Sequence, residues 1–419
     1  MNIFTEEIMN SFYNVNFLDN FTSETLPQKV TSITPTFNRS PYDPSSKNSK
    51  LNPLKWHIDS LISQKNSGLK SIMIIDDASN DYTRDVVKLY QKTSPIEVVY
   101  IKNEERLGLP ITRNKGIENA DTDFIYLSDD DCIDAPYAIH GGLFTFLKLK
   151  EHKEKIGTVN LPVYNRATIP PYMKLSKDIG KIDLENGILS FDSHAFPSEY
   201  VGNKQEEKFL DKKRKILNPI QIDNFNAHLF CSRDALKDVG GFPEDFTWRN
   251  SAGEETEIAL RLQENGYKKY FNPDIKFHAV HLKYGAQGRE ELKGYDWKEN
   301  LPQDVNLKEM VKISAKSVSN TGCRVPSSEW IESDMLGHLT VIGKRNIKGA
   351  LNLAKRTYER FVLRNDPGIY TTFCSHIEDE KKRKDIWESA IEKTVKHLGG
   401  NLSKNQFLNF TTEYENVIV

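Results

Sequence analysis

Two clusters of aspartates follow short apolar runs in this sequence. The first, at 76–77, comes directly after the apolar run at 71–75, and the second, at 129–131, comes directly after 124–127. Three adjacent carboxylates repel one another and are costly to desolvate without a cation. Hard divalent cations such as Mg²⁺ and Mn²⁺ prefer carboxylate oxygens as ligands. The second cluster therefore indicates a metal site, with a solvated acidic turn as the alternative.

A third cluster of acids, at 254–257, opens a predicted helix. Acids in a first helical turn are stabilised by the helix dipole, which explains them without catalysis. A carboxylate at this place could equally act as a general base. Trp248 and Gly253, just upstream, suggest a close approach to the ring of a ligand. For the first cluster the alternative is helix capping, by Asp81 or Thr83.

The elements that must position these acids alternate between strands and helices. A β-rich run at 30–34 is expected to end at Pro35, a turn residue. Apolar periodicity then predicts, in order, a helix at 54–62, a strand at 71–75, a helix around 86–90, a strand at 96–101, a helix at 111–120 and a strand at 124–127. Such alternation is typical of an α/β fold with a mostly parallel sheet flanked by helices. Ligands bind such sheets outside the carboxyl ends of the strands, where the acids are expected.

The rest of the chain falls into segments that differ in their pattern of apolar residues. A strand is expected around 157–164 and further ordered structure from 224 to about 288. Apolar residues at helical spacing recur at 347–361 and 386–398. The expected organisation is an N-terminal arm at 1–28, a catalytic α/β domain at 29–288, and a mainly helical C-terminal region at 289–419 that serves acceptor binding or oligomerisation.

Composition excludes several classes of protein. The 419 residues include 57 Lys+Arg and 59 Asp+Glu, a formal net charge of −2, so no nucleic-acid partner is expected. Four scattered cysteines form neither a disulfide framework nor a CxxC zinc site. No apolar run of about 18 residues and no signal-peptide pattern occur, so the expectation is a cytoplasmic protein, with peripheral attachment to a membrane left open. P-loop, dinucleotide-binding, zincin and hydrolase motifs are missing from the sequence.

The order of the segments resembles glycosyltransferase family 2, whose members have the GT-A (Rossmann-like) fold. The resemblance covers about residues 29–285. It rests on five segments: SITPTFNR at 32–39, IIDDASND at 74–81, GLPITRNKG at 108–116, the DDD run at the position of the metal-binding DxD motif, and VGGFPEDF with GEETEIALRL at 239–262. Two departures stand out: Thr112 replaces the usual Ala, and Glu255 replaces the usual catalytic Asp.

The resemblance implies an inverting, metal-dependent hexosyltransferase that moves a sugar from a nucleotide-diphospho-sugar, with UDP-sugars favoured, to an acceptor hydroxyl. The implied catalytic base is Glu255, with Glu254 as the second candidate. The implied donor-binding residues are Pro35, Thr36, Asn38, Arg39, Asp76, Asp77, Arg113, Asp129 and Asp130. The implied metal ligands, for Mn²⁺ or Mg²⁺, are Asp131, Asp129 and His278, and the implied acceptor contacts are Trp248 and Gly253.

Two other functions stay open at this stage. A nucleotidyltransferase that makes a nucleotide-sugar could use a similar sheet, although such enzymes carry a Gly- and Arg/Lys-rich loop near the first strand that this chain lacks. A non-catalytic sugar- or protein-binding descendant would be expected to have lost the acids that this chain keeps. The acceptor could be a saccharide, a natural product, a lipid-linked sugar or a peptide, and the C-terminal helices are a candidate contact for a homodimer.

Overall fold

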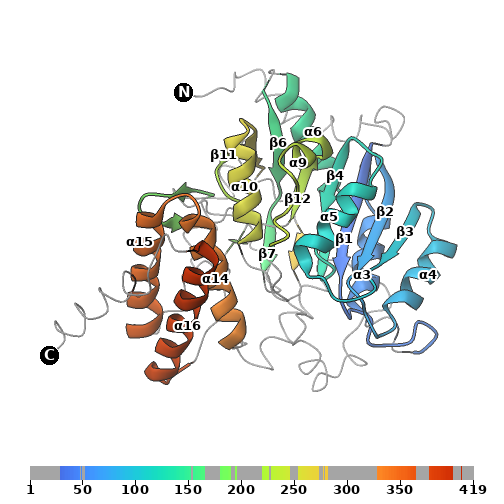
Figure 1. Ribbon diagram of the computed structural model, residues 1–419. Coiled ribbons are helices and arrows are strands. Elements are labelled where there is room, and N and C mark those ends of the chain that lie inside the picture. The colour runs from blue at the N-terminus through green and yellow to red at the C-terminus, as the bar shows by residue number, and fades with distance from the viewer. Residues whose placement is uncertain are drawn as a thin grey trace, which may run out of the picture.

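The computed structural model consists of an α/β region and a helical region at the C-terminal end of the chain (Figure 1). The structure describes residues 29–47, 49, 52–151, 154–165, 180–189, 194–195, 219–225, 228–245, 253–272, 277, 279–281, 328–364, 377–399 and 407. The expected N-terminal arm, at 1–28, lies outside the described residues.

A central sheet of eight strands organises the α/β region. Its strand order is β11-β13-β6-β12-β4-β1-β2-β3. The bounds are β1 Val30–Thr36, β2 Leu69–Asp76, β3 Glu97–Lys102, β4 Phe124–Leu127, β6 Ile156–Asn160, β11 Ile220–Ile222, β12 Leu229–Ser232 and β13 Lys268–Phe271. Strands β1 to β4 pair in parallel, β13 pairs in parallel with β6, and β11 and β12 pair antiparallel to their neighbours. The mostly parallel α/β fold expected from the sequence is confirmed.

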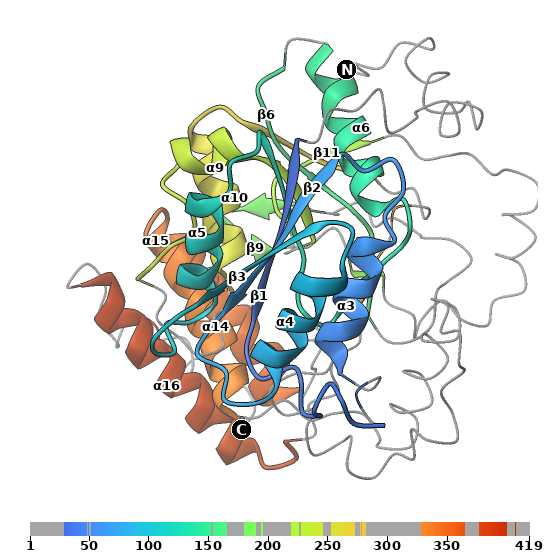
Figure 2. The ribbon, with the colours of Figure 1, turned by 90° about the vertical axis from the view of Figure 1, so that its right-hand side faces the viewer.

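Helices cover both faces of this sheet because its strands are apolar on both faces (Figure 2). On one face, strand residues such as Ile72 and Ile74 pack with three helices, α3 Pro53–Ile62, α4 Thr83–Thr93 and α6 Ala138–Glu151. On the other face, Met73 and Ile75 belong to the core formed with α5 Leu109–Asn119, α9 Arg233–Asp238 and α10 Glu254–Glu264. The alternation of side chains along a strand thus produces two cores from one sheet.

Strand β1 runs one residue past Pro35, so the expected end of the strand at this proline is wrong. Pairing between β1 and β4 ends at Ile33 opposite Leu127, whereas pairing with β2 continues to Thr36 opposite Asp76. Beyond Ile33 the strand therefore has a neighbour on one side only. Proline lacks a backbone N–H and is tolerated at such an edge position.

A second, smaller sheet lies at the end of the central one. Its order is β10-β7-β14-β5, with bounds β5 Cys132–Asp134, β7 Val163–Asn165, β10 His194–Ala195 and β14 Ala279–His281. The single strand expected at 157–164 is thus two strands, β6 and β7, in different sheets. Strand β14 pairs antiparallel to β5, with His281 opposite Cys132, which brings the segment near 280 beside the loop that follows β4.

The C-terminal region is helical, as expected. It consists of α14 Ser328–Gly343, α15 Ile347–Thr357, the π-helical turn η4 Tyr358–Leu363 and α16 Glu380–Leu398, which share one apolar core. A two-stranded hairpin, β8 Ile182–Asp183 and β9 Ile188–Leu189, packs on this core through Leu184 and Leu189. Among the described helices, none has both the length and the apolar character needed to span a bilayer.

Among the described helices of the C-terminal region, α14 is the one that is not predicted from the sequence. Its apolar residues Ile331, Met335, Leu339 and Ile342 are all buried. They recur at helical spacing, so the periodicity that predicts a helix at this place is present in the sequence.

Candidate active site

The two aspartates after β2 are both buried and hydrogen-bonded within the fold. Asp76 Oδ1 accepts the backbone N–H of Ser79 at 2.7 Å. Asp77 accepts three hydrogen bonds from the loop after β3: from Asn103 Nδ2 at 2.9 Å, Leu107 N at 2.8 Å and Gly108 N at 3.0 Å. Asp77 therefore holds the loop that leads into α5.

The loop after β1 is tied to both neighbouring acidic segments. Pro35 and Thr36 are the buried last residues of β1. Asn38 has a φ of 57° and its backbone N–H donates to Ser79 Oγ at 2.8 Å. Arg39 donates through Nε to Asp130 Oδ1 at 2.7 Å and through Nη2 to Asp131 Oδ2 at 3.0 Å. Arg39 thus lies against the acids that follow β4, and Asn38 lies against the loop that follows β2.

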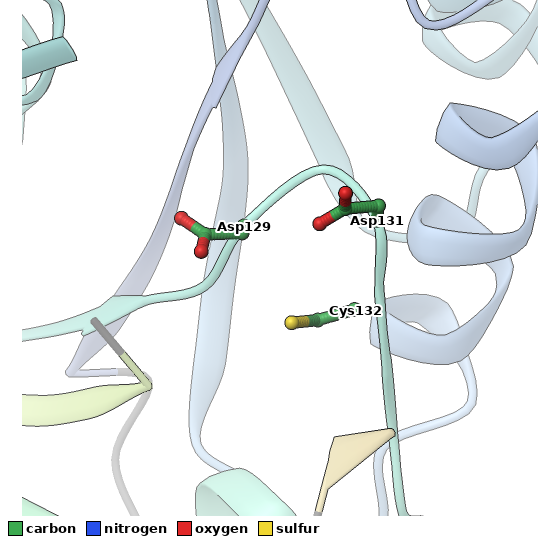
Figure 3. Close-up of side chains that lie close together, drawn as sticks. All are labelled: Asp129, Asp131 and Cys132. Carbon is green, nitrogen blue, oxygen red and sulfur yellow. The ribbon is translucent and has the colours of Figure 1, made fainter. Parts of the chain in front are cut away.

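The three aspartates after β4 differ in their surroundings, and Figure 3 shows two of them, Asp129 and Asp131, beside Cys132. The carboxylate of Asp130 pairs with Arg39, and burial raises the pKa of Asp130 although the Arg39 charge counteracts it. Asp129 and Asp131, with Cys132, place one potential ligand atom each within 4.8 Å of one another. Burial, with the charges of Asp129 and Asp131, raises the pKa of the Cys132 thiol well above its ordinary value. Mg²⁺ and Mn²⁺ prefer oxygen donors, and the oxygen donors of this group are Asp129 and Asp131.

Arg113, on α5, joins the loop after β4 to the start of α10. Its Nη2 lies 3.2 Å from Asp129 Oδ1, and its Nη1 lies 3.1 Å from Glu254 Oε1 and 3.2 Å from Glu255 Oε1. The guanidinium is buried and packs over the ring of Phe242, 5.1 Å from its centroid. Burial alone would lower the pKa of Arg113, but the three surrounding carboxylates raise it. Three carboxylates of the protein thus hold the guanidinium, and its contact with a nucleotide or pyrophosphate stays a prediction.

The two catalytic candidates at the start of α10 have different exposure. Glu254 is buried, and burial, with the charge of Glu255, raises its pKa well above the ordinary value. The side chain of Glu255 keeps 18% of its surface exposed, so only Glu255 of the pair can meet an incoming hydroxyl. Helix α10 begins after Gly253, whose φ of 88° is a left-handed conformation that favours glycine.

Helix α14 packs directly on this helix start. A Cβ at Gly253 would lie 3.0 Å from the backbone carbonyl carbon of Gly337, so a larger residue does not fit there. The close approach expected at Gly253 is therefore to α14. Asp334 and His338, on the same helix, are buried nearby, and the charge of Glu255 contributes to a raised pKa of Asp334. Neither residue is among the site residues predicted from the sequence, because no helix is predicted at 328–343.

A buried polar network supports the loop after β4 from the side of α3. His57 Nδ1 lies 2.7 Å from the carbonyl oxygen of Cys132, and His57 Nε2 lies 2.8 Å from Thr34 Oγ1. Asp134 is hydrogen-bonded by the hydroxyl of Tyr126, which also lies 2.9 Å from His228 Nε2. These residues are buried among strands, and no local pattern of the sequence marks them.

Two predicted site residues, Trp248 and His278, lie outside the described residues. The pairing of β14 with β5 does confirm that the segment around 279–281 returns to the acids after β4.

The chain is similar to known glycosyltransferases. Residues 32–150 match the model of the family "Glycosyl transferase family 2". A relative from Methanococcus voltae, named dolichyl N-acetyl-alpha-D-glucosaminyl phosphate 3-beta-D-2,3-diacetamido-2,3-dideoxy-beta-D-glucuronosyltransferase, is 24% identical over 236 residues, which are 54% of this chain and 65% of the relative. The putative teichuronic acid biosynthesis glycosyltransferase TuaG of Bacillus subtilis is 32% identical over 103 residues, 24% of this chain and 35% of TuaG.

Among solved structures, residues 1–349 of TarS from S. aureus, in complex with UDP-GlcNAc, superpose with a TM-score of 0.45 at 12% identity, covering 93% of this chain and 92% of that chain. The chain spans less than two thirds of the length of the curated relatives named above. The matched segment contains β1 to β4 with the acids that follow β2 and β4. Residues 32–150 therefore carry a domain of glycosyltransferase family 2, within a mixed α/β fold.

Proposed function

We propose that this protein is an inverting, metal-dependent glycosyltransferase that moves a sugar from a nucleotide-diphospho-sugar, with UDP-sugars favoured, to the hydroxyl of an acceptor. The observation that carries the proposal is the set of contacts of Arg113. One guanidinium contacts Asp129, in the predicted metal and donor loop, and Glu255, the predicted base. The proposed metal-binding loop and the proposed base thus contact the same buried side chain.

The acids after β4 fit a hard divalent cation. Asp129 and Asp131 offer carboxylate oxygens, which Mg²⁺ and Mn²⁺ prefer, and the Asp129 side chain keeps 35% of its surface exposed. A bound cation would supply positive charge to a leaving diphosphate. Arg39 holds the second carboxylate of this pair in place through Asp131 Oδ2.

Glu255 is the proposed general base. It would take the proton from the acceptor hydroxyl while the hydroxyl oxygen bonds to the anomeric carbon of the donor. The bond from that carbon to the diphosphate breaks, and the nucleoside diphosphate leaves with the electron pair. Attack from the face opposite the leaving group inverts the configuration. Arg113 contacts Oε1 of Glu255 and so restrains the orientation of the base.

The acceptor is proposed to be a saccharide or a lipid-linked sugar. The Methanococcus voltae relative is named for transfer to a sugar linked to dolichyl phosphate, and the Bacillus subtilis relative for teichuronic acid biosynthesis, so both act in the assembly of glycans. The acceptor contacts Trp248 and Gly253 and a homodimer through the C-terminal helices stay predictions.

Product analysis tests the proposal. The full chain is incubated with Mn²⁺ and a panel of UDP-sugars, with and without oligosaccharide acceptors, and released nucleotide and pyrophosphate are measured. Release of UDP that requires Mn²⁺ supports the transferase. In a parallel incubation with UTP and a sugar 1-phosphate, release of pyrophosphate would identify a nucleotidyltransferase instead. Binding of UDP with no turnover of any donor would identify a non-catalytic descendant.

A further inference from the structure

The two proposed metal ligands, Asp129 and Asp131, lie on a single tight turn. The backbone N–H of Cys132 donates to the carbonyl oxygen of Asp129 at 3.0 Å, which closes the turn over residues 129–132. Just before the turn, the backbone N–H of Ser128 donates to the carbonyl oxygen of Ile33 on β1 at 3.4 Å. The position of the Cys132 backbone therefore sets the geometry of the turn that carries both carboxylates.

Strand β5, which begins at Cys132, is bound to helix α3. It is the last strand of the second sheet and pairs there with β14. The carbonyl oxygen of Cys132 lies 2.7 Å from His57 Nδ1, and the backbone N–H of Asp134 donates to Ser60 Oγ at 3.2 Å. His57 and Ser60 are three positions apart, so they lie on the same face of α3. Two side chains of a helix thus make the hydrogen bonds that a further strand would make at this edge.

Both ring nitrogens of His57 are used in these contacts. A carbonyl oxygen can only accept a hydrogen bond, so Nδ1 carries a hydrogen and donates it to Cys132. Nε2 lies 2.8 Å from Thr34 Oγ1 on β1, which sets the orientation of the ring. The Asp134 carboxylate is a poorer partner, because its Oδ2 lies 3.8 Å from Nδ1 and its Oδ1 accepts from Tyr126. His57 is fully buried, so solvent cannot take over its contact with Cys132.

We propose that His57 is a positioning residue for the metal site: its Nδ1–H holds the backbone of Cys132 and so keeps Asp129 and Asp131 in the arrangement that binds a divalent cation. This role rests on the proposed function, in which these two carboxylates bind Mn²⁺ or Mg²⁺. His57 is not itself a ligand, because both of its nitrogens are used within the protein. Groups that hold metal ligands in place typically contribute about 10- to 100-fold to metal affinity.

Two substitutions of His57 separate its two ring contacts. In His57→Asn, the amide nitrogen takes the place of Nδ1 and can still donate to Cys132. In His57→Gln, the amide takes the place of Nε2 and leaves the carbonyl oxygen of Cys132 without its donor. The probe is Mn²⁺ alone, titrated into the full chain and followed by electron paramagnetic resonance. We expect His57→Gln to raise the Kd for Mn²⁺ by about 10- to 100-fold and His57→Asn to raise it by less than about threefold.

The matched control is His140→Gln. His140 is also buried, and its Nδ1 lies 2.9 Å from a backbone carbonyl oxygen, that of Asn66 in the loop after α3. The substitution therefore removes the same kind of contact without touching the turn at 129–132. We expect it to lower Tm, as His57→Gln does, but to leave the Kd for Mn²⁺ within about twofold of the wild-type value.

Thermal unfolding of each variant separates positioning from folding. A wild-type Kd for Mn²⁺ in His57→Gln overturns the role, even where Tm falls, and so does a loss of affinity in His57→Asn equal to that in His57→Gln. If His57→Gln does not fold, Thr34→Val decides, because it removes the hydroxyl that orients the ring. Its Kd for Mn²⁺ is expected to rise at least about threefold, and an unchanged Kd overturns the role. The proposed metal dependence fails separately, when the wild-type protein itself binds no Mn²⁺.

Discussion

Nη1 of Arg113 lies 3.2 Å from Oε1 of Glu255, although 142 positions separate the two residues in the chain. The same guanidinium contacts Asp129 in the loop after β4. The charge of Arg113 therefore acts on both the predicted base and the predicted metal loop. A change at any one of these side chains is therefore expected to alter the charge that the other two experience.

Removal of the proposed base should abolish transfer without weakening donor binding. We expect Glu255→Gln to lower kcat by about 10²–10⁴-fold, the usual contribution of a positioned general base, while the Kd for UDP with Mn²⁺ stays within about twofold. Initial rates of UDP release and isothermal titration with UDP measure the two quantities. The matched control is Glu185→Gln, an exposed residue whose carboxylate pairs with Lys348. Turnover near the wild-type rate in Glu255→Gln would exclude Glu255 as the base.

Loss of the shared guanidinium should destabilise the fold. Arg113→Met leaves Asp129, Glu254 and Glu255 close together without their common cation, so we expect the free energy of unfolding to fall by about 3–5 kcal/mol. Urea unfolding at pH 7 measures it. The exposed Arg364, replaced in the same way, should cost less than about 0.5 kcal/mol. An Arg113→Met variant as stable as the wild-type protein would show that the three carboxylates do not need this cation.

The metal site should depend on two of the three aspartates. We expect Asp129→Asn and Asp131→Asn each to weaken Mn²⁺ binding by at least about tenfold, because each removes a charged oxygen donor. Cys132→Ser should change the Kd for Mn²⁺ by less than about threefold, since Mn²⁺ prefers carboxylate oxygens to sulfur as ligands. Titration of Mn²⁺ followed by electron paramagnetic resonance gives these constants directly. A tenfold loss in Cys132→Ser would instead identify the sulfur as a ligand.

The buried imidazole of His338 should make stability depend on pH. Burial lowers the pKa of His338 from 6.5 to about 4 in the folded protein. As the pH falls below 6.5, the unfolded chain binds a proton that the folded protein does not bind. The free energy of unfolding therefore decreases between pH 6.5 and about 4, by about 3 kcal/mol in total. His338→Gln removes this titration and should lose less stability than the wild-type protein between pH 7 and pH 4.5. Equal losses in both proteins, measured by urea unfolding, would contradict the assignment.

Local patterns of the sequence predict most of the α/β elements. The apolar run at 71–75 predicts β2, and the periodicity of Val86, Val87 and Tyr90 predicts α4, because burial on one or both faces leaves its period in the sequence. Pro35 shows where such reasoning fails. A proline ends a strand that has two neighbours, but it remains in β1 because β4 no longer pairs beside it.

The sequence by itself determined that acids follow β2 and β4 and open α10, because these positions depend on the order of residues along the chain. Only the tertiary structure decided which acids meet. Asp130 turns to Arg39, Asp77 to the loop at 103–108, and Glu254 and Glu255 to Arg113. The packing of α14 on the start of α10, where Gly337 lies against Gly253, was likewise decided only by the tertiary structure. The physical reason is that hydrogen bonds and proton affinities depend on which groups share a buried volume, and residues far apart in the chain come to share one only when the sheet and its helices have assembled.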